Sequence, residues 1–187
     1  MIRYADDCVW AFEHKEDAVR FYSLLKERLG KFSLELSEEK SSIIEFSPDD
    51  PRGGGFCFLG FEYNWSRDRN GKPHVQKQTS MKKFRSSILA FKEWIRTNRS
   101  LKLRELIRRL NIKLRGYYNY FGIIGNSHRL HKFDFIVMGI LRKWLSRRSQ
   151  RGSINWERFG KIKERIIRPF INENPRRKAA PKVVYCY

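Results

Sequence analysis

The sequence contains few cysteines and has no long apolar run. Cys8, Cys57 and Cys186 are odd in number and widely spaced, which argues against a disulfide framework and against a zinc site. No stretch approaches the about 18 apolar residues of a membrane span, and no charged leader opens the chain, so we expect neither a transmembrane helix nor a signal peptide. These absences favour a cytoplasmic protein.

Acidic residues are scarce in the second part of the chain. The net charge is +20, and residues 64–187 carry 32 Lys+Arg against 7 Asp+Glu, whereas residues 1–63 carry 8 against 13. Between residues 80 and 148 the only acids are Glu93, Glu105 and Asp134. A merely solubilising surface mixes both signs, so this excess predicts binding to a polyanion, with nucleic acid favoured over a membrane surface.

The first twelve residues place two adjacent carboxylates, Asp6 and Asp7, between two groups of strand-forming residues. This pattern predicts a hairpin with both carboxylates at its tip. Adjacent carboxylates repel unless a cation neutralises them, and Mg²⁺ prefers oxygen ligands. Two-metal phosphoryl transfer needs at least one more carboxylate. The alternative is an ordinary exposed Asp-Asp turn.

A helix and further strands are predicted up to about residue 78. Residues 15–29 have the apolar spacing of a helix that packs on a sheet. Residues 32–46 predict a loop and a strand in which Leu34 and Leu36 alternate. Lys40 lies in a polar stretch of this segment, and it is either a solvated lysine or a contact to a phosphate.

A β-hairpin is expected next. Residues 56–63 have strand propensity throughout, and Gly60 marks a bulge or a close backbone approach. Asn70-Gly71 predicts a hairpin turn that leads into a return strand at residues 73–76.

Beyond residue 79, apolar residues recur at steps of three and four. The expected core positions run from Met81 to Ile95, from Leu103 to Tyr118 and from Leu130 to Trp144, with Asn126-Ser127 as the cap of the third helix. Short connections between the helices predict a three-helix bundle. The candidate phosphate-binding cations on its outer faces are Lys82, Lys83, Arg85, Lys92, Arg108, Arg109 and Arg115.

These elements predict an α+β protein with a partial antiparallel sheet covered by one helix, followed by a basic helical bundle and an irregular tail. We expect three parts, at residues 1–78, 79–150 and 151–187. The last part is a basic tail with a short helix that ends before Pro169 or Phe170 and a terminal strand at residues 183–187.

Four segments resemble, in the same order, motifs of one family. Residues 3–7 (RYADD) resemble the YADD motif of a polymerase palm, and residues 34–41 (LELSEEKS) resemble the palm block that follows. Residues 58–61 (FLGF) resemble the last palm block, and residues 114–121 (LRGYYNYF) resemble the signature of the thumb/maturase domain. The chain therefore resembles the carboxyl-terminal portion of a group II intron reverse transcriptase/maturase.

The resemblance implies an RNA-directed DNA polymerase that also assists the splicing of its intron RNA. It implies that Asp6 and Asp7 are catalytic Mg²⁺ ligands and that Lys40 lies near the phosphates of the incoming nucleotide. It also implies contacts of Tyr4, Gly60, Tyr118 and the cations above with primer/template or intron RNA. The implied partners are intron RNA and an RNA template paired with a DNA primer.

The fingers and the first palm aspartate of this family would lie upstream of Met1. We therefore expect an incomplete polymerase site that is inactive alone and requires a separate polypeptide carrying the fingers and the upstream palm. The main hypothesis is a fragment of an intron-encoded polymerase/maturase that binds intron RNA in splicing and retrotransposition. The alternatives are a stand-alone, non-catalytic RNA-binding or splicing-assisting protein and a decayed reading frame.

Overall fold

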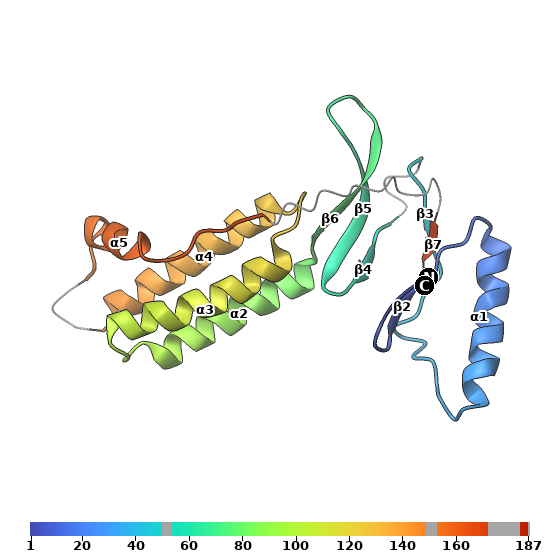
Figure 1. The fold of residues 1–187 in the computed structure, drawn as a ribbon, viewed down its shortest axis with the longest axis horizontal. Coiled ribbons are helices and arrows are strands. Elements are labelled where there is room, and N and C mark those ends of the chain that lie inside the picture. Colours follow the sequence, from blue (N-terminus) through green and yellow to red (C-terminus); the bar gives the residue numbers. More distant parts are fainter. Residues whose placement is uncertain (50–53, 149–152, 172–183, 187) are drawn as a thin grey trace. The chain divides into compact units, whose positions relative to one another are not determined.

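The computed structural model describes residues 1–49, 54–148, 153–171 and 184–186 (Figure 1). The chain divides into two units. A strand-rich unit comprises residues 1–77 and 178–187, and a helical unit comprises residues 78–177. Strands and helices together confirm the α+β class that the sequence predicts.

The strand-rich unit begins with the expected hairpin. Strand β1 (Ile2–Tyr4) pairs antiparallel with β2 (Asp7–Val9), and Tyr4 lies opposite Asp7. Ala5 and Asp6 therefore form a two-residue turn, in which Ala5 has a φ of 54° and its carbonyl accepts a 2.9 Å hydrogen bond from Arg3 Nε. The carboxylates of Asp6 and Asp7 accordingly lie at the tip of the hairpin and at the first residue of its second strand.

Helix α1 (Lys15–Gly30) packs on the residues that follow this hairpin. The ring of Phe21 lies 5.2 Å from the rings of both Trp10 and Phe12. Only Ala18 is fully buried on the helix. The predicted helix is present, and it is held mainly by aromatic contacts.

The predicted alternation at Leu34 and Leu36 does not produce a strand. The backbone N–H groups of Lys40 and Ser41 both donate to the carbonyl of Ser37, so this polar segment forms a turn. The strand begins later, as β3 (Ile44–Phe46), and it pairs antiparallel with the terminal strand β7 (Val184–Cys186). Two backbone hydrogen bonds to one carbonyl close the polar segment into a turn, which the alternation of Leu34 and Leu36 does not reveal.

A three-stranded sheet follows, in the order β4 (Phe56–Phe58), β5 (Phe61–Arg67) and β6 (Pro73–Thr79). The expected continuous strand at residues 56–63 is wrong, because Leu59 and Gly60 have positive φ angles of 51° and 78° and form a two-residue hairpin turn. Gly60 is thus a turn residue and not a bulge.

The turn predicted at Asn70-Gly71 connects β5 and β6. The carboxylate of Asp68 accepts hydrogen bonds from the backbone N–H groups of Asn70 and Lys72, at 2.9 and 2.8 Å. The Gly71 N–H donates to the Asp68 carbonyl. An aspartate at the start of a turn stabilises it through such bonds to the following backbone.

The helical unit contains helices α2 (Met81–Asn98), α3 (Leu103–Phe121), α4 (Ser127–Ser146) and α5 (Trp156–Lys163). Figure 1 shows α2, α3 and α4 running alongside one another, as the three-helix prediction requires.

Helix α5 ends at Lys163, well before the limit near Pro169 that the sequence predicted. It belongs to the helical unit, whereas β7 belongs to the strand-rich unit, so the expected tail is divided between the two. Its basic loop at residues 172–183 lies outside the described residues.

Stacked aromatic rings fill the centre of the bundle. The rings of Tyr117 and Phe133 stack at 3.8 Å, and Phe91 meets Phe133 edge-on at 5.1 Å. Most predicted core positions are buried. Met81 is exposed instead, and four further positions are only half-buried: Ile88, Leu103, and Ile140 and Trp144 of α4. The neighbouring apolar residues Met138, Leu141 and Leu145 are buried instead.

Asn126 does not cap α4 with its side chain, contrary to the prediction. The side chain is fully buried and joins three backbone segments. Its Oδ1 accepts from the Thr79 N–H at 2.9 Å, and its Nδ2 donates to Thr79 Oγ1 and to the Phe121 carbonyl, both at 2.8 Å. Asn126 therefore connects Thr79, which precedes α2, with Phe121 at the end of α3.

The segment after α5 is attached to α3. The Asn111 side chain donates to the Arg165 carbonyl at 2.9 Å and accepts from the Ile167 N–H at 3.1 Å. Gly122 lies directly under this segment, because a Cβ atom there would come within 2.3 Å of the Tyr118 carbonyl oxygen and 2.5 Å of the Phe170 carbonyl oxygen. A glycine is required for this close approach.

Helices of the described residues are all too short or too polar to cross a membrane.

Candidate nucleic-acid interface

Each of the three acids in the bundle already has a partner. Glu93 accepts from the Arg96 guanidinium at 2.6 Å, and Asp134 accepts from the Tyr118 hydroxyl at 2.9 Å. Glu105 binds two arginines, as described below. The acids therefore leave the other cations of helices α2 to α4 unneutralised.

Helix α2 presents a row of such cations. Lys82, Arg85 and Lys92 are exposed and lie three and seven residues apart, which places them on one face of the helix. Lys83 is also exposed, beside this row. None of these four residues forms an ion pair with another described residue. The predicted cations of α2 are therefore available to bind phosphate.

Two of the predicted cations on α3 are held by an acid. Glu105 accepts hydrogen bonds from Arg108 at 2.9 Å and from Arg109 at 2.6 Å. These hydrogen bonds lower the pKa of the Glu105 carboxyl to about 2. Arg115 is exposed without an ion pair among the described residues. The charge of Arg108 and Arg109 is thus partly neutralised, while that of Arg115 is not.

Tyr118 cannot contact RNA in this structure, contrary to the expectation from its motif. Its side chain is completely buried, and its hydroxyl donates to Asp134. Burial, followed by the charge of Asp134, raises the pKa of the phenol, which remains protonated at neutral pH. Tyr118 is a core residue that orients the carboxylate of α4.

The two most exposed aromatic residues of the helical unit were not predicted as site residues. Phe135 on α4 is 77% exposed and Trp156 on α5 is 70% exposed. The sequence did contain one signal, because Phe135 falls outside the apolar stripe from Leu130 to Trp144. A single exposed aromatic residue is common on protein surfaces, so Phe135 gains meaning only together with other exposed rings or cations beside it.

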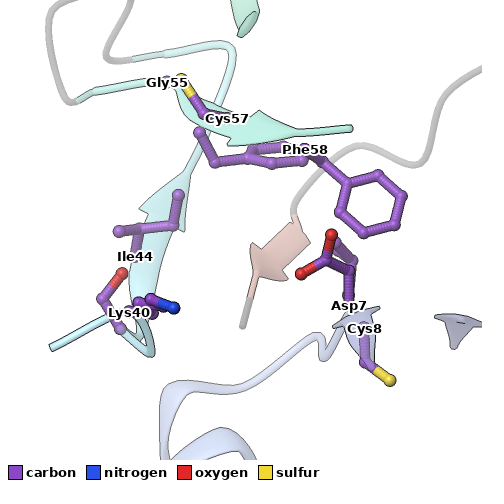
Figure 2. A pocket seen from close by; sticks show the side chains of 10 residues that line it. Asp7, Cys8, Lys40, Ile44, Gly55, Cys57 and Phe58 are labelled. Carbon is purple, nitrogen blue, oxygen red and sulfur yellow. The ribbon is translucent and has the colours of Figure 1, made fainter. Parts of the chain in front are cut away.

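The strand-rich unit contains a pocket of about 330 Å³ that is lined by Asp7 and Lys40, among other residues. Figure 2 shows the Asp7 carboxylate and the Lys40 ammonium on the border of the same space, with Phe58 above them. Asp7 comes from β2, Lys40 from the turn before β3 and Phe58 from the end of β4. The structure therefore brings two of the predicted site residues together, although they form no ion pair with each other.

The described residues do not form a complete two-metal site. Asp6 does not line the pocket, and no group of three or more His, Cys, Asp or Glu side chains lies close enough together to hold a metal ion in the described part of the chain. Two carboxylates are fewer than a two-metal site needs. The binding of Mg²⁺ by Asp6 and Asp7 therefore stays a prediction.

The other two site residues predicted in this unit lie at hairpins. Tyr4 is 65% exposed at the end of β1, and Gly60 occupies the turn between β4 and β5. Neither residue lines the pocket. Their contact with primer or template stays a prediction.

The helical unit combines an aromatic core with exposed, unpaired cations, which is typical of a nucleic-acid-binding domain. Residues 81–163 match the family model of the group II intron, maturase-specific domain. This match confirms that residues 81–163 resemble the maturase part of a group II intron protein, as the sequence motif at residues 114–121 predicted. Comparisons with curated proteins and with solved structures gave no significant match. The motifs at residues 3–7, 34–41 and 58–61 lie outside the matched range, so their assignment to a reverse transcriptase stays a prediction.

Proposed function

We propose that this chain assists group II intron splicing by binding intron RNA through the basic faces of α2 and α3. The observation that carries the proposal is the row of unpaired cations Lys82, Arg85 and Lys92 within the residues that match the maturase-specific domain. Arg115 extends the basic surface onto α3.

The physical basis of binding is the release of condensed counterions. Each phosphate that a lysine or arginine neutralises frees cations from the RNA, so the logarithm of the affinity falls linearly with the logarithm of the salt concentration. Cations that already have a protein carboxylate as partner contribute less. We therefore expect the α2 row to contribute more than Arg108 and Arg109.

The test replaces Lys82, Arg85 and Lys92 together with glutamine and measures binding to structured intron RNA over a range of salt concentrations. We expect weaker binding and a salt dependence shallower by about 2 to 3 in log–log slope, since each phosphate contact contributes about 0.7 to 0.9. The matched control replaces the exposed α1 residues Lys15, Arg20 and Arg28 with glutamine and removes the same charge. An equal loss in the control would show that only net charge matters and would contradict the proposal.

The pocket that holds Asp7 and Lys40 favours a second proposal, in which the strand-rich unit is part of a polymerase site. This site needs a further carboxylate and a nucleotide-binding surface from another polypeptide. Asp6→Ala and Asp7→Ala should then leave RNA affinity unchanged, and the chain alone should not extend a DNA primer on an RNA template with Mg²⁺. Robust DNA synthesis by this chain alone would contradict the proposal that its polymerase site is incomplete. No effect of either substitution in a reconstituted polymerase would favour a non-catalytic RNA-binding protein.

A further inference from the structure

Helix α4 carries an exposed aromatic surface that the basic row on α2 does not include. It consists of Phe135 and of Trp156, whose indole lies against Arg142 of α4. The guanidinium carbon of Arg142 is 3.5 Å from the Trp156 ring centroid, which is a stacking distance. We call these three residues and the exposed Gly139 between them the α4 aromatic face.

The helical geometry places both rings on one side of α4. Phe135 and Arg142 are seven residues apart, which is close to two full turns, so they lie on the same face roughly 10 Å apart along the axis. Gly139 is exposed between them, and a Cβ atom there would meet no other atom within 4 Å. The space between the two rings is therefore open.

Arg142 covers one face of the Trp156 indole and leaves the other face to solvent. An indole that is 70% exposed cannot be covered on both faces. The Nε atom of Arg142 is itself buried and has no hydrogen-bond partner among the described residues. The guanidinium is thus held against the ring by stacking, and the opposite face of the ring is free to stack with another planar group.

Hydrogen bonds hold the backbone at the start of α5 and just after its end, while Arg142 holds the Trp156 ring by stacking. Asn155, the cap of α5, accepts from the Arg158 N–H at 2.9 Å, and Asn111 of α3 binds the segment after the helix. A ring that is already ordered loses little conformational entropy on binding. The α4 aromatic face is therefore preorganised.

The charges around these rings identify the occupant. Lys132 and Lys143 are exposed near the two ends of this face, on the same flank of α4, and neither forms an ion pair with a described residue. The acid of α4, Asp134, already accepts from Tyr118. Lysine is depleted at the centres of protein interfaces, whereas aromatic rings that alternate with cations are typical of surfaces that bind single-stranded nucleic acid.

We propose that Phe135 and Trp156 stack with unpaired bases of RNA, while Lys132 and Lys143 neutralise the adjoining phosphates. This inference rests on the proposed RNA-binding function and adds a site that distinguishes unpaired from fully paired RNA. Arg142 acts as a positioning residue that presents the Trp156 ring.

The experiment compares two probes, a single-stranded oligonucleotide of unstructured RNA and inorganic polyphosphate of similar charge, which has no bases. Their affinities are measured for the full chain and for Trp156→Leu and Phe135→Leu. Each substitution keeps apolar bulk and removes the ring. We expect each variant to bind the oligonucleotide about 5- to 150-fold more weakly and to bind polyphosphate unchanged.

Both side chains are exposed, so the variants should unfold at the temperature of the unmodified chain. Leu24→Ala on α1 is the control, because Leu24 is an exposed apolar residue of the strand-rich unit and its replacement should change neither affinity. An unchanged affinity for the oligonucleotide, or an equal loss for polyphosphate, overturns the stacking proposal alone. The stacking proposal is also overturned if the substitutions abolish only self-association or the binding of a protein. Failure of the unmodified chain to bind any RNA overturns the proposed function itself.

Discussion

The two units of this chain differ in how completely they bury their apolar side chains. In the described part of the helical unit, a continuous core includes Tyr118, Phe133 and Leu110, which are almost completely inaccessible to solvent. Among the described residues of the strand-rich unit, the buried apolar side chains are Ala18, Phe46 and Phe61. It leaves several large apolar residues exposed: Met1, Ile2, Tyr4, Val19, Leu24, Phe32 and Leu34.

This difference follows from the lengths of the elements. Helices of 18 to 20 residues present several turns of an apolar stripe to one another. The hairpin β1–β2 has strands of three residues, and an isolated two-stranded hairpin is only marginally stable. The helices of the helical unit thus bury their apolar stripes against one another, whereas several large apolar side chains of the strand-rich unit stay exposed.

The largest effect is expected for Phe133→Ala. This substitution removes the ring that stacks on Tyr117 and meets Phe91, and it should lower the free energy of unfolding of the helical unit by about 3 to 5 kcal/mol. RNA binding should be lost in parallel. Thermal unfolding and RNA affinity measured on the same sample check both effects.

Phe46→Ala in the strand-rich unit provides the comparison. Phe46 is equally well buried, against Phe56 and Trp65. Its removal should weaken that unit and leave RNA affinity unchanged. Loss of RNA binding in Phe46→Ala would show that the two units depend on each other, contrary to the comparison.

An intermediate effect is expected for Asn126→Ala. The substitution leaves the buried N–H of Thr79 without its acceptor and the Phe121 carbonyl without this donor, which should cost about 1 to 3 kcal/mol. Denaturant unfolding of the helical unit measures the loss. Asn98→Ala, which removes one half-buried hydrogen bond to the Trp94 carbonyl, serves as the control and should cost less. Equal costs would contradict the central role of Asn126.

The smallest effect is expected for Glu105→Gln. Neutralising this acid releases Arg108 and Arg109, so RNA should bind a few-fold more tightly and with a steeper salt dependence. Because folding lowers the pKa of Glu105 from 4.5 to about 2, its stabilising contribution is present above about pH 4.5 and is lost as the pH falls through about 2. The carboxyl is exposed, so this contribution is small. An NMR titration that places its pKa near 4.5 would contradict the two ion pairs.

Most helices and the α+β class could be predicted from the sequence, because their apolar spacing repeats over many residues. The errors lie where single residues decide the structure. Leu59 and Gly60 turn the chain although both neighbouring segments favour strands, and Asn126 satisfies backbone groups distant in sequence rather than its own helix. The spacing of apolar residues along the sequence does not predict either the turn at Leu59-Gly60 or the buried bonds of Asn126.

The candidate interface was predictable only in part. The cations of α2 are exposed as their spacing predicts, but the pairing of Arg108 and Arg109 with one acid and the burial of Tyr118 depend on the folded helix and core. The Trp156 site was missed because the stacking of Arg142 on a residue 14 positions later becomes visible only in the folded chain. The proposed role of the Trp156 ring depends on its contact with Arg142, which the sequence around Trp156 does not reveal.

The absence of a side chain at Gly122 has a consequence for the whole helical unit. The carbonyl oxygens of Tyr118 and Phe170 both approach this position closely, and the rings of the same two residues meet edge-on at 6.0 Å, so the end of α3 and the segment after α5 are packed together there. Even one added methyl group at this position would push the two segments apart. Replacing Gly122 by alanine would therefore displace the segment after α5 from α3 without changing any residue of the basic or aromatic surfaces.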